Sequence, residues 1–153
     1  MILLKAIPSS EKCFWDEDFA AKPTFTCGSV LGGEDYFFEL AYTSDDPKHV
    51  PKAMMKMEVI SPIADLLTIQ TVHQVPNMYP VLLPAIEAND PNYLRTKPGL
   101  YPDLLRPFNP AKDPMFIPYG ELRSMLITVS VPKGYPAGEY PITFRLTPSW
   151  DET

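Results

Sequence analysis

The stretch ELRSMLITVSVPKGYPAGEYPITFRL, residues 121–146, decides the fold class of this sequence. In its first half, the apolar residues of one face recur at every second position, as in a half-buried β-strand: Met125, Ile127, Val129 and Val131. Its second half repeats this alternation: Ile142, Phe144 and Leu146. Between the halves, two glycines and a proline in segment 133–138 favour a turn. The stretch therefore predicts two β-strands, joined either as a hairpin or by a turn that crosses between the sheets of a sandwich.

Composition supports the same class for the whole chain. With 153 residues, 45% of them hydrophobic, the sequence can build one core, and we expect residues 1–153 to form a single domain. It contains 19 prolines, against the roughly eight that average usage would give. Prolines interrupt helices, whereas eight tyrosines, eight phenylalanines and two tryptophans are too many for a disordered tract. The composition therefore indicates an all-β protein with proline-stiffened loops.

Further strands are predicted along the chain by apolar alternation and β-branched residues, each bounded by turn residues: 1–6 at a sheet edge, 24–30, 36–43, 54–61 and 66–75. In segment 36–43 one face is aromatic and aliphatic, while Glu39 and Thr43 on the other face are expected to meet water near the strand ends. Segment 63–70 is also compatible with a helix, but its threonines and isoleucines favour a strand.

Residues 76–118 carry ten prolines, so we expect them to form a long, ordered, proline-rich loop excursion, pinned by its own aromatic side chains. A short edge strand at 81–83 is left open. The prediction for the whole chain is an immunoglobulin-like or jelly-roll-like β-sandwich of seven or eight strands.

Charge and hydropathy exclude several classes of function. A net charge of −6 and a pI of about 4.8 oppose binding to the phosphate backbone of a nucleic acid. No apolar run reaches the length of a membrane-spanning helix, and the first residues do not resemble a secretory signal. We therefore expect no nucleic-acid or membrane partner, and a cytoplasmic location if the chain is complete at its N-terminus.

The sequence predicts no cofactor and no metal site. Cys13 and Cys27 could form a disulfide in an exported chain, but two reduced, mostly buried thiols are the favoured interpretation. His49 and His73 lie at no spacing typical of zinc ligands. The acidic run at 16–18 is expected to be a solvated face or turn rather than a cation site.

Asp103 is the best-placed candidate acid in the proline-rich segment. Glycoside hydrolysis needs two carboxyl groups flanking one bond, and the possible companions are Glu87, Asp90 and Glu121. An aspartate after a proline is, however, a natural acceptor in a loop or helix cap, so catalysis by this chain alone is not expected.

Aromatic residues supply the candidate binding residues. Trp15, Trp150 and the tyrosines of the long segment could form a platform on which a sugar ring stacks, although aromatics in all-β domains lie more often in the core. Trp150, just past the last predicted strand, is the residue most expected to be exposed. The candidate binding set is Tyr101, Asp103, Tyr119 and Trp150.

Three short motifs resemble a known family: YPDLL at 101–105, VSVP at 129–132 and AGEYPI at 137–142. In this order they resemble the N-terminal β-sandwich of proteins of the glycoside hydrolase family 123 type, over roughly the second half of the chain. The resemblance implies a β-sandwich that precedes a (β/α) barrel, in which an aspartate–glutamate pair cleaves N-acetylgalactosamine-type or related β-glycosides.

No such barrel is present in these 153 residues, so the family's catalytic residues have no counterpart here. The resemblance implies a non-catalytic N-terminal accessory domain of a glycoside hydrolase, with a catalytic barrel of the same or a longer chain as its partner. Asp103 and the neighbouring tyrosines would then belong to a loop beside that barrel. The alternative is an independent carbohydrate-binding module that uses exposed aromatics.

Overall fold

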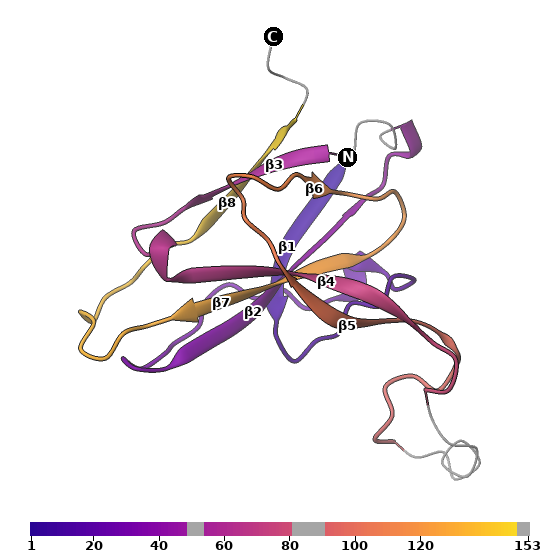
Figure 1. The fold of residues 1–153 in the computed structure, drawn as a ribbon, viewed down its shortest axis with the longest axis horizontal. Helices are drawn as coiled ribbons and strands as arrows, with labels where there is room; N and C mark the ends of the chain where they lie inside the picture. Colours follow the sequence, from indigo (N-terminus) through magenta and orange to yellow (C-terminus); the bar gives the residue numbers. More distant parts are fainter. Residues whose placement is uncertain (49–53, 81–90, 150–153) are drawn as a thin grey trace.

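The chain folds into two antiparallel β-sheets that pack face to face, in a computed structural model that describes residues 1–48, 54–80 and 91–149 (Figure 1). One sheet has the strand order β1-β2-β7-β4-β5: Ile2–Pro8, Asp35–Ser44, Arg123–Ser130, Leu67–Asn77 and Gly99–Pro107. The other has the order β6-β3-β8: Met115–Phe116, Met54–Ile60 and Thr143–Pro148. Short 3₁₀ helices also occur, among them η1, Phe19–Ala21, and η3, Ala64–Leu66. The expected all-β sandwich is confirmed.

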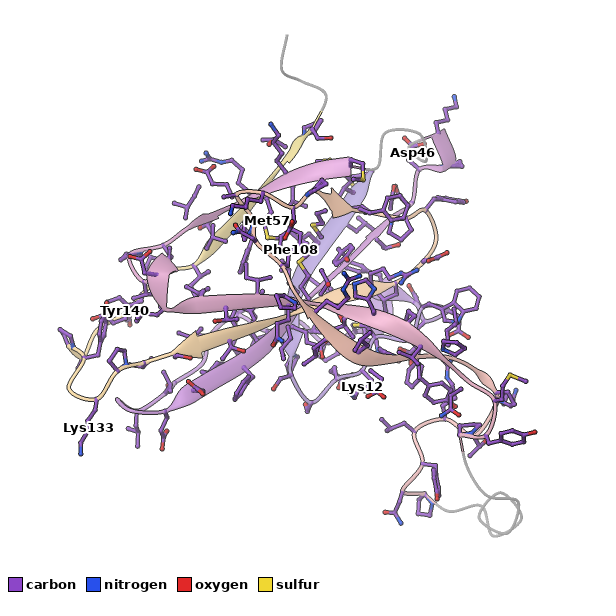
Figure 2. The ribbon with its side chains drawn as sticks, viewed as in Figure 1. Lys12, Asp46, Met57, Phe108, Lys133 and Tyr140 are labelled. Carbon is purple, nitrogen blue, oxygen red and sulfur yellow. The ribbon has the colours of Figure 1, made fainter. Side chains whose placement is uncertain are left out.

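The main core lies between the two sheets. On β7 the alternation read from the sequence holds, because Met125 and Ile127 are fully buried and face the second sheet. Phe38 of β2 meets Phe144 of β8 edge to face, with ring centroids 6.3 Å apart. Figure 2 shows Met57 and Phe108 in the same interior, and both belong to this core.

The turn after β7 carries the chain from one sheet to the other. β7 belongs to the five-stranded sheet and β8 to the three-stranded sheet, so the sandwich-crossing alternative is correct and the hairpin alternative is wrong. Gly134 adopts a φ of 81°, which favours glycine. Tyr140, seen at this turn in Figure 2, packs its ring 5.5 Å from that of Tyr135 and donates to the carbonyl of Pro136 at 2.8 Å.

The N-terminal segment, residues 9–22, covers the back of the five-stranded sheet. Cys13 packs there with Ile7, Ala41 and Leu122 in a second buried cluster. This cover corrects one expectation: Glu39 and Thr43 are not near water but only 7% and 8% exposed. Alternation along β2 could not reveal that a distant loop covers the second face.

Segment 24–30 is not a strand in the structure, contrary to the expectation. The Phe25 amide donates to the Ala6 carbonyl at 2.8 Å, but the segment forms no continuing ladder with β1. The Phe25 ring instead stacks against Tyr36 and Phe38, with centroids 5.8 Å and 5.5 Å away. Side-chain packing, rather than strand pairing, therefore holds this segment.

The proline-rich segment contains a regular element that the sequence analysis did not predict. β5 pairs with β4 from Gln70 opposite Pro107 to Asn77 opposite Gly99. A strand with this many prolines is tolerated because β5 is the sheet edge, where a missing N–H need not leave a neighbour unpaired. The expected loop excursion over the whole of 76–118 is therefore wrong. Residues 81–83 lie outside the described part of the chain.

The remaining predicted strands are confirmed near their expected positions, as β1, β2, β3, β4, β7 and β8. The weak helical alternative for 63–70 reduces to the single 3₁₀ turn Ala64–Leu66 before β4. Within the ranges that the structure describes, no helix has the length and apolarity that crossing a membrane requires.

Truncation of Ile127 tests the central position of β7. Because this side chain is 0% exposed between the sheets, Ile127→Ala should lower the free energy of unfolding by about 2–5 kcal/mol. Thr128→Ala, on the opposite face of the same strand, should cost less than about 1 kcal/mol. Urea denaturation measures both values, and equal losses would contradict this assignment of the core face.

Candidate functional site

The side chain of Tyr101 stabilises the segment before β5 through two hydrogen bonds and one ring contact. Its hydroxyl donates to the carbonyl oxygens of Arg95 and Lys97, at 3.1 Å and 2.8 Å. The rings of Tyr101 and Phe14 pack edge to face, with centroids 5.5 Å apart. These contacts hold the segment before β5 against the N-terminal segment, and they occupy a side chain that was a candidate for stacking on a sugar.

Asp103 lies at an irregularity in β5. Pro102 pairs with Gln74 and Leu104 with His73, so Asp103 is the extra residue of a β-bulge. Its side chain is exposed and forms no hydrogen bond or ion pair with the described residues. The bulge presents a carboxylate at the sheet edge.

The candidate acid companions of Asp103 do not add a second free carboxylate. Glu121 precedes β7, which β4 separates from β5, and its Oε2 accepts from Arg123 at 2.6 Å. Glu87 and Asp90 lie outside the described residues. Within the described ranges, no three histidine, cysteine, aspartate or glutamate side chains gather as a metal site would require.

Tyr119 lies in a different part of the sheet. It is 47% exposed in the connection from β6 to β7, and its backbone bridges to Ser44 at the end of β2. Two strands, β7 and β4, separate β2 from β5, which carries Tyr101 and Asp103. Trp150 lies outside the described residues. The predicted binding residues that can be placed are thus distributed over two regions.

The end of the β4–β5 ribbon carries exposed aromatics that the candidate set did not include. Tyr79 is 89% exposed and Tyr93 is 40% exposed. The Tyr79 amide donates to Oδ1 of Asn77 at 3.1 Å, which forms a turn where the strand pairing ends. The tyrosines of the long segment were expected either to pin the excursion or to form a stacking platform, and neither Tyr79 nor Tyr93 was singled out. The available sequence signal was the pair of turn residues that flank Tyr79, Asn77 and Pro80.

Arg95 fixes the segment before β5 to the N-terminal segment. Its guanidinium donates to Oδ1 of Asp16 at 2.7 Å and lies 3.9 Å from the centre of the Phe14 ring. The hydrogen bond from Arg95 holds the pKa of Asp16 below its ordinary value. The acidic run therefore serves a turn and an ion pair, in agreement with the structural interpretation.

A shallow groove of about 560 Å³ opens between β3, the start of β4 and the segment after β5. Its walls are mostly apolar and include Val59, Leu67 and Phe108. Of the polar groups at its rim, Glu58 pairs with Arg145 at 3.0 Å, and Oδ1 of Asn109 accepts from the Ala111 amide at 3.0 Å. The groove offers apolar contact area, and the acidic residue in its lining, Glu58, is ion-paired with Arg145.

A buried polar cluster lies behind the five-stranded sheet, under the N-terminal segment. Nε2 of Gln74 donates to the Cys13 carbonyl at 3.2 Å. Three other polar atoms there are fully buried and have no partner among the described residues: Glu39 Oε2, Gln74 Oε1 and Ser124 Oγ. Burial raises the pKa of the Glu39 carboxyl and raises the pKa of the Cys13 thiol to about 12. The thiol is therefore protonated near neutral pH and is a poor nucleophile.

Cys27 and His73 are the remaining titratable candidates. Cys27 is a free, exposed thiol and Cys13 is a free, buried one, so the expectation of reduced cysteines agrees with the structure but that of burial holds for Cys13 alone. Nε2 of His73 lies 3.0 Å from the Thr71 hydroxyl, and burial, with Arg106 and Arg123 nearby, lowers its pKa. His73 is thus mostly neutral near pH 7.

One solved structure resembles this chain over its whole length. It is a family 123 glycoside hydrolase from Clostridium perfringens, with a TM-score of 0.64 and 11% sequence identity over 100% of this chain. This chain covers 26% of that protein, about a quarter of its length. No protein-family model matches the sequence, and no curated protein matches it. At this identity the likeness establishes the fold.

The buried carboxyl of Glu39 predicts a pH-dependent stability. Because its folded pKa lies above the ordinary value of 4.5, its contribution is complete below that pH and is lost as the pH rises through the folded pKa. Glu39→Gln removes the charge and should stabilise the chain toward neutral pH, with little change in acid. Urea unfolding from about pH 4 to about pH 8 measures this. Glu58→Gln, on an exposed face, should leave the pH dependence of the free energy of unfolding as it is in the wild type. The same pH dependence in the Glu39→Gln variant as in the wild type would contradict the prediction.

Proposed function

We propose that this chain is a non-catalytic accessory β-sandwich domain of a glycoside hydrolase, which packs against the catalytic domain. The observation that carries the proposal is the match of the whole chain to 26% of a family 123 glycoside hydrolase. That protein was studied for the hydrolysis of glycolipid glycans. A fold that occupies a quarter of such an enzyme supports a role as one part of a larger assembly.

The described side chains support a non-catalytic role. Cleavage of a glycosidic bond needs two carboxyl groups about 5–10 Å apart, one as an acid and one as a base or nucleophile. Asp103 stands exposed at the sheet edge, and Glu121 is already paired with Arg123. Glu39 has the raised pKa that a general acid needs, but the N-terminal segment covers it, so a substrate does not reach it.

A second candidate function is carbohydrate binding by this chain alone. The observation that favours it is Tyr79, whose side chain is 89% exposed at the end of the β4–β5 ribbon. A tyrosine ring in this position presents a flat face on which the C–H groups of a sugar can stack. The accessory role is preferred because the candidate residues that the structure describes, Tyr101, Asp103 and Tyr119, are distributed over two regions of the sheet and do not form a row.

The accessory role predicts mutual stabilisation in the longest polypeptide that contains residues 1–153. Deleting these residues should lower the Tm of the rest by several degrees, because an apolar interface is exposed. The isolated chain should not hydrolyse a chromogenic β-N-acetylgalactosaminide. Calorimetry and the hydrolase assay measure both. Turnover by the isolated chain, or an unchanged Tm after deletion, would overturn the proposal.

Carbohydrate binding is tested on the 153-residue chain with a glycan array. The accessory role predicts no specific binding, from a protein whose fold is verified by circular dichroism. Tyr79→Ala and Tyr119→Ala form a matched pair, since their parent side chains are both exposed but lie at different places on the fold. Binding that is lost in Tyr79→Ala and kept in Tyr119→Ala would make the second function the correct one.

A further inference from the structure

Exposed apolar side chains concentrate on one unit of the fold, the β4–β5 ribbon. Within the described ranges, 14 large hydrophobic side chains are exposed. Six of them lie between residues 78 and 105: Met78, Tyr79, Tyr93, Leu94, Leu104 and Leu105. Figure 1 shows this ribbon projecting from the rest of the sandwich. Beyond Val72, β4 pairs only with β5 and no longer with β7, and the N-terminal segment contacts this part of the ribbon at Gln74, Tyr101 and Arg95.

The second half of β5, from Asp103 to Pro107, is exposed on both faces. Leu104 and Leu105 are consecutive, so their side chains point to opposite faces of the strand. They are 52% and 41% exposed, so neither the three-stranded sheet nor the N-terminal segment covers them. Phe108, just after the strand, is by contrast buried in the main core. On β5 the uncovered apolar surface therefore begins after the buried Pro102 and ends where the chain enters the core.

The ribbon is held in place before any partner binds. Strand pairing continues to Asn77 opposite Gly99. The hydroxyl of Tyr101 ties the approach to β5, and Arg95 anchors it to Asp16 and Phe14. A surface fixed in this way loses little conformational entropy on binding. Rigid support for exposed leucines is what a docking surface needs.

The edge of β5 disfavours pairing with an additional β-strand. Pro102 and Pro107 lack the N–H groups that a new strand would use, and the bulge at Asp103 interrupts the register. A second copy of the chain therefore cannot extend the sheet across this edge in regular register. The exposed groups available for contact are side chains.

The chemistry of these side chains favours a protein partner over a glycan. Four of the six are aliphatic: Met78, Leu94, Leu104 and Leu105. Such side chains bury well against an apolar protein surface but lack the flat ring face on which a sugar stacks. The similar solved chain is about four times as long as this one, since this fold covers 26% of it, so a sandwich of this fold is there one part of a longer protein.

We infer that the outer edge of the β4–β5 ribbon, where Leu104 and Leu105 project on either side of β5 and Met78 and Leu94 lie at the end of the ribbon, is the surface on which the catalytic domain docks; this inference rests on the proposed function. It assigns the contact to the outer edge of the five-stranded sheet, and not to the outer face of the three-stranded sheet. There Met54 and Phe116, paired across β3 and β6, form a smaller exposed apolar pair.

The test places charges on each surface in the longest polypeptide that contains residues 1–153. The docking variant is Leu104→Lys with Leu105→Lys, and the control is Met54→Lys with Phe116→Lys. Hydrogen exchange of residues 99–107 is compared between that polypeptide and the 153-residue chain. We expect the longer polypeptide to slow exchange there at least about tenfold, with the docking variant losing this protection and the control keeping it.

Each outcome decides between the inference and the function beneath it. Protection lost in the control and kept in the docking variant would overturn the inference while the accessory role stands. Thermal coupling between the domains without any protection at 99–107 would do the same. Absence of coupling in the wild type would overturn both. A concentration-dependent dimer of the 153-residue chain that the docking variant abolishes would identify a second copy as the occupant, and would also overturn the inference.

A second docking variant serves if the first one does not fold. Met78→Lys with Leu94→Lys changes the end of the ribbon, where the parent side chains are 69% and 77% exposed. Substitution at such exposed positions should leave the urea midpoint of the 153-residue chain nearly unchanged. If Leu104→Lys with Leu105→Lys unfolds the chain, the same exchange measurement on this variant decides the inference.

Discussion

The fold depends on covering both faces of the five-stranded sheet. On the front, Met125 and Ile127 of β7 are fully buried against the three-stranded sheet. On the back, the N-terminal segment supplies Cys13 to a second cluster with Ile7 and Ala41. In β2, every residue from Phe38 to Ser44 is buried, so neither face of this part of the strand meets water. The buried polar groups and the exposed apolar edge of the sheet both depend on which residues these two layers cover.

The back cover brings polar groups into the interior. Glu39 and Ser124 lie on the face that the N-terminal segment closes, and each has a buried oxygen without a partner in the described ranges. Burial of such groups costs free energy unless they are neutral or hydrogen-bonded. The raised pKa of Glu39 is the consequence, since the protonated carboxyl tolerates this site better than the carboxylate does. A raised pKa here reflects packing rather than a catalytic arrangement.

Neither cover reaches the second half of β5, from Asp103 to Pro107. There the sheet presents aliphatic side chains on both faces, on a strand that prolines and a bulge protect from strand addition. A rigid apolar edge of this kind fits a domain that works beside another domain. The fold likeness to a quarter of a glycoside hydrolase, the separated candidate residues and the bare edge support one proposal from three independent directions.

Alternation within single segments determined the fold class, because the pleat of a strand is a local property. The pattern of residues 121–146 predicted β7 and β8, and that of 36–43 predicted the inward face of β2. Contacts between distant segments decided the rest. Burial of Glu39 requires the N-terminal segment, and β5 becomes a strand because β4 lies beside it at a sheet edge that tolerates proline. No periodicity within either segment carries that information, so only the tertiary structure revealed it.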